Sequence, residues 1–265
     1  DRSASRWRFA ASRLFRLGLP VVFGLFVLVM PQAYYELRQD GLIESGILAF
    51  YPDYLAIDQR FPSPTPTWNH LWYLVYLLVY ILITLPFSPW LRAISNSRLF
   101  RVVAGSPVSL LVLVILPFVV FELALSPRFP TTHNLVWDWA NHAHRLSIFL
   151  LGFIAAKHTV FWRSVDRALL PSALLVALLL VVRLHGDDAW VWARNALPER
   201  LAVFAFVAAQ ILYAWSCILL LLGLAQRYLD RSSAALSYLT GAVFCYYVLH
   251  QTIIVVAGYH LTGLD

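Results

Sequence analysis

Long apolar stretches alternate with short polar stretches along nearly the whole chain. Six of them contain no charged residue: Leu17–Tyr35, Leu71–Leu91, Val102–Phe121, Ala168–Val182, Leu201–Gln226 and Ala234–Tyr259. A helix of about 20 apolar residues crosses the roughly 30 Å hydrocarbon core of a bilayer. The Ala168–Val182 stretch is shorter, but the adjacent Arg183 can extend its aliphatic stem to reach the interface. The pattern therefore predicts six membrane-spanning helices.

A seventh apolar stretch, Leu146–Ala156, is too short to cross a bilayer alone. At about 1.5 Å per residue it covers roughly half of the hydrocarbon core. Because its neighbours require it to cross, we expect its helix to extend backwards through the segment WDWANHAHR. The extension would bring five polar residues to or below the outer interface: Asp138, Asn141, His142, His144 and Arg145. This segment therefore carries chemistry or a buried polar network.

Composition agrees with a membrane protein. Of the 265 residues, 60% are hydrophobic and 13% are charged, and the mean hydropathy is +0.70. In soluble domains about a quarter of the residues are charged. We therefore expect an all-α polytopic membrane helix bundle with about seven transmembrane helices, organised as a single domain over residues 1–265.

The distribution of arginine predicts the orientation. When the loops are assigned by alternation, 13 of the 20 basic residues fall on the side that also holds the N-terminus. The positive-inside rule makes this side cytoplasmic. The net charge of +6 then reflects topology and contact with lipid headgroups, and no soluble basic region indicates a nucleic-acid partner. Cys217 and Cys245 both lie in predicted spans, which favours neither a disulfide nor a cysteine-based metal site.

The segment TWNHLWYLVYLLVY places His70 and Trp72 at the start of a predicted span. A solvated histidine in an aromatic interface belt is the plainer interpretation. The alternative is a site residue near the outer membrane surface.

In the segment HNLVWDWANHAHR, Asp138 and His142 are four residues apart, and Arg145 follows three residues later. On a helix these positions share one face, where a carboxylate, an imidazole and a guanidinium can hold a histidine tautomer or an anion. An interfacial polar cap is the alternative. His142 and His144 are two residues apart and cannot face the same ligand on a regular helix.

The segment CYYVLHQTIIVV places His250 and Gln251 in the middle of the last apolar stretch. An unpartnered polar group costs free energy at this depth, so each needs a partner or a function. The alternative is an interhelical hydrogen bond. The scattered polar residues Glu122, Gln210 and Ser216 favour packing rather than catalysis.

Several classes of membrane protein can be weighed on these residues. A retinal protein is excluded, because the sole lysine, Lys157, lies at a predicted helix end rather than in mid-span. A bis-histidine haem protein needs facing mid-span histidines, and His250 has no evident partner. A non-catalytic transporter or carrier with an intramembrane histidine path remains the alternative. An enzyme that uses acid–base chemistry at the membrane fits best.

Five motifs then carry a resemblance to a known family. In order, they are RLFRLGLPVVFG, MPQAYYE, HLWYLVYLLVY, HNLVWDWANHAHRLSIFLLGFIAA and YYVLHQTIIVV. They resemble the acyltransferase-3 family of bacterial multi-pass membrane enzymes, and in particular the branch that includes a glucan-modifying succinyltransferase. The resemblance covers nearly the whole chain.

The resemblance implies an acyltransferase of the bacterial inner membrane that transfers groups other than amino-acyl groups. An acetyl or succinyl type group would pass from acyl-CoA, as donor substrate, to hydroxyls of a carbohydrate or cell-envelope glucan, with no bound cofactor or metal. We take His70, His142 and His250 as candidate catalytic residues. The candidate substrate-binding residues are Asp138, Arg145, Gln251, Trp72 and His144.

One feature departs from the family pattern. Members begin with a helix that bears an arginine and the histidine base, and they close with a helix after the HQ span, whereas this sequence holds neither. We therefore expect a piece of a longer protein that is inactive alone, with Gln32 and Tyr35 exposed to hydrocarbon.

Overall fold

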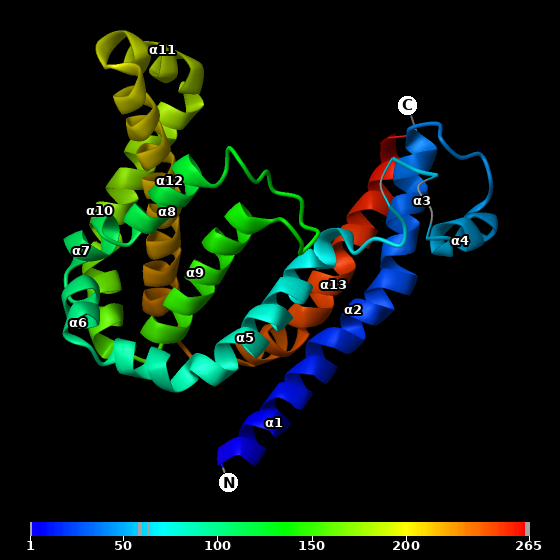
Figure 1. Ribbon diagram of the computed structural model, residues 1–265, viewed down its shortest axis with the longest axis horizontal. Helices are drawn as coiled ribbons and strands as arrows, with labels where there is room; N and C mark the ends of the chain where they lie inside the picture. Colours follow the sequence, from blue (N-terminus) through cyan, green and yellow to red (C-terminus); the bar gives the residue numbers. More distant parts are fainter. Residues whose placement is uncertain (1, 58–59, 63, 263–265) are drawn as a thin grey trace. The chain divides into compact units, whose positions relative to one another are not determined.

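The computed structural model describes residues 2–57, 60–62 and 64–262, and this part of the chain is helical, with no strand. Its internal contacts divide the chain into two compact units. Unit 1 comprises residues 1–85 and 232–265, and unit 2 comprises residues 86–231. Figure 1 shows the helices of both units in chain order. The all-α polytopic prediction is confirmed, whereas the single-domain prediction stays a prediction.

Unit 1 is built from the two ends of the chain. Its first helical stretch runs through α1 (Arg2–Arg13), η1 (Leu14–Gly18), α2 (Leu19–Phe23), η2 (Gly24–Leu28) and α3 (Val29–Gln39). The other elements are α4 (Ile47–Leu55), η3 (Asn69–Leu71), the first half of α5 (Trp72–Ser95) and α13 (Ala234–Thr262). Helix α13 packs against α3 and η2. The core of this contact contains Val29, Leu71, Leu74 and Val248.

The segments η1 and η2 are π-helical turns, which interrupt the regular bonding of an α-helix. Side chains from other elements bond the carbonyl groups of η2. Tyr51 and Tyr54 of α4 donate their hydroxyls to the carbonyls of Phe26 and Leu25, at 3.0 and 2.6 Å. Burial raises the pKa of Tyr54 to about 12. The widened turn therefore anchors α4 through neutral hydroxyl groups.

Unit 2 is a helical bundle. It contains the end of α5, α6 (Arg98–Ala104), α7 (Pro107–Val112), α8 (Ile115–Ala124), α9 (Trp139–Ala155), α10 (Thr159–Leu184), α11 (Gly186–Ala196), α12 (Glu199–Leu224) and η4 (Ala225–Leu229). Helices α10 and α12 pack along their lengths, and α8 packs on α12. Trp215 is buried in the core and donates its indole N–H to the Leu110 carbonyl at 2.8 Å.

Six helical segments are long and apolar enough to cross a membrane, among the residues described: Trp7–Gln39, Asn69–Ser95, Pro107–Ala124, Thr159–Leu184, Glu199–Leu229 and Ala234–Thr262. They correspond to the six predicted spans, with one correction. The predicted Val102–Phe121 span is not continuous, because α6 ends at Ala104 and a new helix begins at Pro107. Ser106 caps that helix by accepting from the Ser109 N–H, and proline favours the first helical turn.

Helix α9 begins at Trp139 and runs for 17 residues. At about 1.5 Å per residue it is about 25 Å long, most of the hydrocarbon thickness. The helix does extend backwards from the short apolar stretch, as far as Trp139, and it carries His142, His144 and Arg145. It is not among the six segments long and apolar enough to cross a membrane, so the seventh span stays a prediction. Asp138 lies immediately before the first turn.

Candidate functional site

In unit 1, His70 lies in a network of neutral polar groups contributed by η3, α3 and α13. The fully buried Gln32 is its hub. The Gln32 amide nitrogen lies 2.7 Å from Thr252 Oγ1 and 3.5 Å from His70 Nδ1, and its oxygen accepts from the Asn69 amide at 3.3 Å. The other ring nitrogen of His70, Nε2, lies 3.1 Å from the Val248 carbonyl. Residues far apart in the sequence thus share one network.

The partners fix the direction of each hydrogen bond. Thr252 donates its hydroxyl hydrogen to the Leu28 carbonyl at 2.7 Å, so its oxygen accepts from Gln32. A carbonyl only accepts, so Nε2 of His70 carries the hydrogen that faces Val248. Nδ1 of His70 is then the acceptor that faces Gln32. Both ring nitrogens of His70 are engaged, and the neutral tautomer is set by the protein.

His250 differs from His70 in one respect. Its Nδ1 lies 2.7 Å from the Tyr247 carbonyl one turn earlier in α13, so Nδ1 carries the hydrogen. No residue in the described part of the chain bonds its Nε2, and the side chain is exposed. The His250 ring meets the His70 ring edge-on, with centroids 5.3 Å apart. His250 therefore presents a nitrogen lone pair beside a fixed imidazole, an arrangement suited to accepting a proton.

Two other predicted residues of unit 1 lie near this network. Trp72 packs edge-on against the rings of Tyr73 and Tyr76, at centroid distances of 6.0 and 5.3 Å. Gln251 is half-buried and forms no hydrogen bond with the described residues. The next residue, Thr252, makes the contact to Gln32 instead.

The expectation for Gln32 is wrong. Its side chain is fully buried and its amide is bonded by Thr252 and Asn69, so it is not exposed to hydrocarbon. Tyr35 is half-buried, and its hydroxyl lies 3.2 Å from His260 Nε2. The sequence showed a glutamine in an apolar stretch, but its principal partner is 220 positions away.

In unit 2, Asp138 organises the entrance to α9. The side chain is fully buried and accepts from the backbone N–H groups of Thr132 and His133, at 3.0 and 3.2 Å. It also accepts from the Asn141 amide at 2.8 Å, and Asn141 accepts from Arg145 Nε at 3.1 Å. A buried carboxylate thus fixes both the preceding loop and, through Asn141, the guanidinium of Arg145. The sequence pointed to Asp138 and Arg145 but not to the linking Asn141 contact.

His142 and His144 point in different directions, as their spacing requires. Nε2 of His142 bonds the Leu135 carbonyl at 2.9 Å, in the loop before α9. His144 packs against the rings of Phe118 and Phe121 on α8, and its Nε2 lies 3.4 Å from a Glu122 carboxylate oxygen. Glu122 therefore lies beside a histidine, although their contact does not have hydrogen-bond geometry.

A cavity of about 610 Å³, which we call the arginine cavity, lies among α8, α9, α10 and α12. Its polar lining consists of Glu122, His144, Arg145, Arg183, Gln210 and Tyr213. Arg183 donates to the Gln210 amide oxygen and lies over the Tyr213 ring, 5.8 Å from its centroid. From the sequence, Arg183 was interpreted as an interfacial anchor and Gln210 as a packing residue. The two become neighbours only because α10 and α12 pack together.

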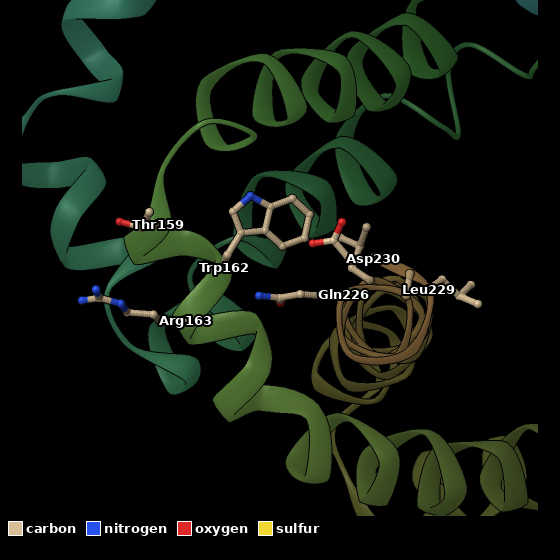
Figure 2. A pocket seen from close by; sticks show the side chains of 8 residues that line it. Thr159, Trp162, Arg163, Gln226, Leu229 and Asp230 are labelled. Atoms are coloured by element: carbon tan, nitrogen blue, oxygen red, sulfur yellow. The ribbon is translucent and has the colours of Figure 1, made fainter. Parts of the chain in front are cut away.

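A second cavity of unit 2, of about 640 Å³, lies at the opposite end of the α10–α12 pair, and we call it the inner pocket. Trp162 and Arg163 contribute from the first turns of α10, and Gln226 and Asp230 contribute from η4 and the residue that follows it. Figure 2 shows the Gln226 amide extending from η4 toward α10, whereas the Arg163 guanidinium points away from Gln226. The Gln226 amide oxygen is buried without a hydrogen-bond partner among the described residues.

The structure thus places the predicted site residues in two groups. His70, His250, Trp72 and Gln251 belong to unit 1, and Asp138, His142, His144 and Arg145 belong to unit 2. The catalytic roles predicted for His70, His142 and His250 stay predictions. The described residues contain no group of three or more His, Cys, Asp or Glu side chains that could hold a metal ion.

Comparison with known proteins gives one result. The model of the acyltransferase-3 family, described as an acyltransferase domain, matches residues 2–265. No curated protein and no solved structure matches the chain. The family match covers almost every residue, including both polar networks, and the chain therefore belongs to the acyltransferase-3 family of membrane acyltransferases.

Proposed function

We propose that this membrane acyltransferase uses acyl-CoA as its donor and transfers an acetyl or succinyl type group to a hydroxyl of a carbohydrate or cell-envelope glucan. The observation that carries the proposal is the imidazole of His250, which we assign as the base in place of the histidine that the resemblance puts on a preceding helix. Its Nδ1–H is held by the Tyr247 carbonyl and its Nε2 is accessible. A sugar hydroxyl is a poor nucleophile at neutral pH, and a positioned imidazole is the usual group that removes its proton.

The proposed reaction has a simple balance of atoms. Nε2 of His250 takes the proton of the acceptor hydroxyl while the hydroxyl oxygen attacks the carbonyl carbon of the thioester. The carbon–sulfur bond then breaks, and the imidazolium returns its proton to the departing thiolate. The products are an acyl ester and free coenzyme A.

His70 has a positioning role in this proposal. Both of its ring nitrogens are bonded, and its ring lies edge-on to His250. Tyr247 donates its hydroxyl to the His70 backbone carbonyl and presents its own carbonyl to His250. Trp72 and Gln251 remain proposed substrate-binding residues near the start of α5 and in α13. His142 remains a proposed contributor to proton transfer.

The inner pocket is a candidate for the nucleotide portion of the donor. An indole can stack on a base, an amide oxygen can accept from an exocyclic amine, and a guanidinium can bind phosphate. Trp162 and Gln226 supply the first two groups, and Arg163 supplies the third once its side chain turns toward the pocket from the direction that Figure 2 shows. The predicted orientation places this pocket on the cytoplasmic side, where acyl-CoA is available.

Mass spectrometry of surface glycans tests the proposed function. Cells that express the full-length protein are compared with cells that lack it, and we expect ester-linked acyl groups only in the first. In proteoliposomes, release of free coenzyme A should require both acyl-CoA and the glucan acceptor. Histidine-dependent uptake of a solute without ester formation would contradict acyl transfer and support the transporter alternative.

A further inference from the structure

The arginine cavity is lined by two arginine residues, Arg145 and Arg183. Arg183 lies in the last turn of α10, a candidate membrane span, and its side chain is exposed. Its bonding partners are the neutral amide of Gln210 and the ring of Tyr213. No carboxylate among the described residues forms an ion pair with it.

The remaining lining groups add to this positive character. Arg145 is held in place by Asn141, and its guanidinium borders the same cavity. The one carboxylate of the lining, Glu122, already accepts the Ser126 hydroxyl at 2.9 Å and faces His144 at 3.4 Å. Two guanidiniums and one carboxylate give the lining a net positive charge even with a neutral imidazole. Such a cavity attracts an anion.

The apolar part of the lining indicates what the anion is attached to. Ile148, Phe206, Val207, Ile211 and Ile218 border the cavity together with the polar groups. The volume of about 610 Å³ is far larger than a single inorganic ion needs. Oxygen atoms of a phosphate match the donors of guanidinium groups, and a hydrocarbon chain matches the isoleucine side chains.

We infer that the arginine cavity binds the phosphate group of an anionic lipid, with Arg183 and Arg145 as its ligands and Gln210 as the residue that orients Arg183. The predicted orientation places this site in the outer half of the bilayer. The inference does not depend on acyl transfer, because it concerns a binding site in unit 2 whose occupancy can be measured without turnover. The residue that sequence reasoning treated as an interfacial anchor becomes the main ligand.

Lipid binding to the full-length protein tests the inference. The purified protein is placed in nanodiscs of phosphatidylcholine doped with phosphatidic acid, and bound lipid is measured by native mass spectrometry. We expect selective retention of phosphatidic acid, and a roughly tenfold to hundredfold weaker binding in Arg183→Gln, the range expected for loss of a charged hydrogen-bonding partner. Arg183→Lys should lose less, because it keeps the charge.

Arg194 supplies a matched control. It also lies over an aromatic ring, Trp190, at 5.8 Å, but it is on α11 and does not line the cavity. Arg194→Gln should leave phosphatidic acid binding unchanged. An equal loss in both variants would show general interfacial attraction and overturn the site. If Arg183→Gln does not fold, Gln210→Leu tests the same site without removing a charge.

A competition experiment separates the two possible sources of phosphate. Inorganic phosphate should displace phosphatidic acid only at concentrations far above those of the lipid, which supports a lipid ligand. Equal displacement at matched concentrations would contradict the lipid as occupant and assign the cavity to a soluble phosphate. Absence of any phosphate-dependent binding, with a folded protein, would overturn the inference altogether.

Discussion

In unit 1 the buried polar groups are neutral amides, hydroxyls and imidazoles that bond one another, whereas in unit 2 charged side chains surround a cavity. Gln32, Asn69, Thr252 and His70 satisfy one another and the adjacent carbonyls. Arg183 has only an amide and an aromatic ring. A network whose members are all bonded fixes a conformation, while a charge that faces open volume can serve a ligand.

The contrast extends to the histidines. In unit 1, His70 is hydrogen-bonded at both ring nitrogens, whereas His250 is hydrogen-bonded at only one. In the proposed function His70 is thereby a positioning residue, and His250 is the residue whose Nε2 can accept a proton. Variants that remove one kind of group but not the other test this distinction.

The largest effect is expected at His250. His250→Gln in the full-length protein should lower acyl transfer by about 10²–10⁴-fold, the usual contribution of a general base. Thermal unfolding should change little, because the side chain is exposed and its one bond is to a carbonyl of its own helix. Coenzyme A release in proteoliposomes measures the loss. His185→Gln, at an exposed histidine of unit 2, is the control, and equal turnover in both variants would remove His250 from the reaction.

A smaller effect is expected at Asp138, the buried carboxylate of unit 2. Asp138→Asn keeps the shape but replaces one acceptor oxygen with a donor, although three N–H groups face the carboxylate. We expect the free energy of unfolding to fall by about 1.5–3 kcal/mol, the range for hydrogen bonds to charged groups. Denaturant titration in detergent measures it. Asp188→Asn, at an exposed position on α11, should be nearly neutral, and an equal loss there would contradict a specific role of Asp138.

The neutral hub of unit 1 should be somewhat less costly to remove. Gln32→Leu leaves Asn69, Thr252 and His70 without their shared partner, and we expect a loss of about 1–3 kcal/mol. The ring of His70 would also lose its fixed orientation, so acyl transfer should fall while the protein remains folded. Gln39→Leu, at the exposed end of α3, is the matched control. An unchanged melting temperature for Gln32→Leu would show that the network contributes nothing to stability.

The same contrast explains what sequence reasoning could reach. The apolar pattern located the spanning helices, and the short stretch at Leu146–Ala156 correctly required α9 to begin near Trp139. The break before Pro107 was missed, although Gly105, Ser106 and Pro107 are typical of a helix boundary. The residues on both sides of the break are apolar, so the stretch looked like one continuous span.

The partners of polar residues were harder to predict. A sequence shows that Gln32 or Arg183 is costly in a membrane, but it does not show which residue offsets that cost. Thr252 and Gln210 become partners only through packing of helices that are distant in sequence. The candidate histidines could be named for this reason, while the distinction between His70 and His250 needed the positions of the carbonyls around them.

The smallest expected effects compare two helical glycines of unit 2. A methyl group at Gly223 would lie 2.9 Å from Leu169 Cδ1 and 3.6 Å from Val165, where α12 packs closely on α10. Gly223→Ala should therefore lower stability by about 1 kcal/mol, because the strain of overpacking exceeds the gain in helix propensity. Gly152 of α9 has nothing within 4 Å of such a methyl group, and Gly152→Ala should raise stability by roughly 0.5 kcal/mol. Differential scanning fluorimetry in detergent resolves shifts of opposite sign. A shift of the same sign in both variants would mean that the Leu169 side chain moves aside without cost, and it would contradict overpacking at Gly223.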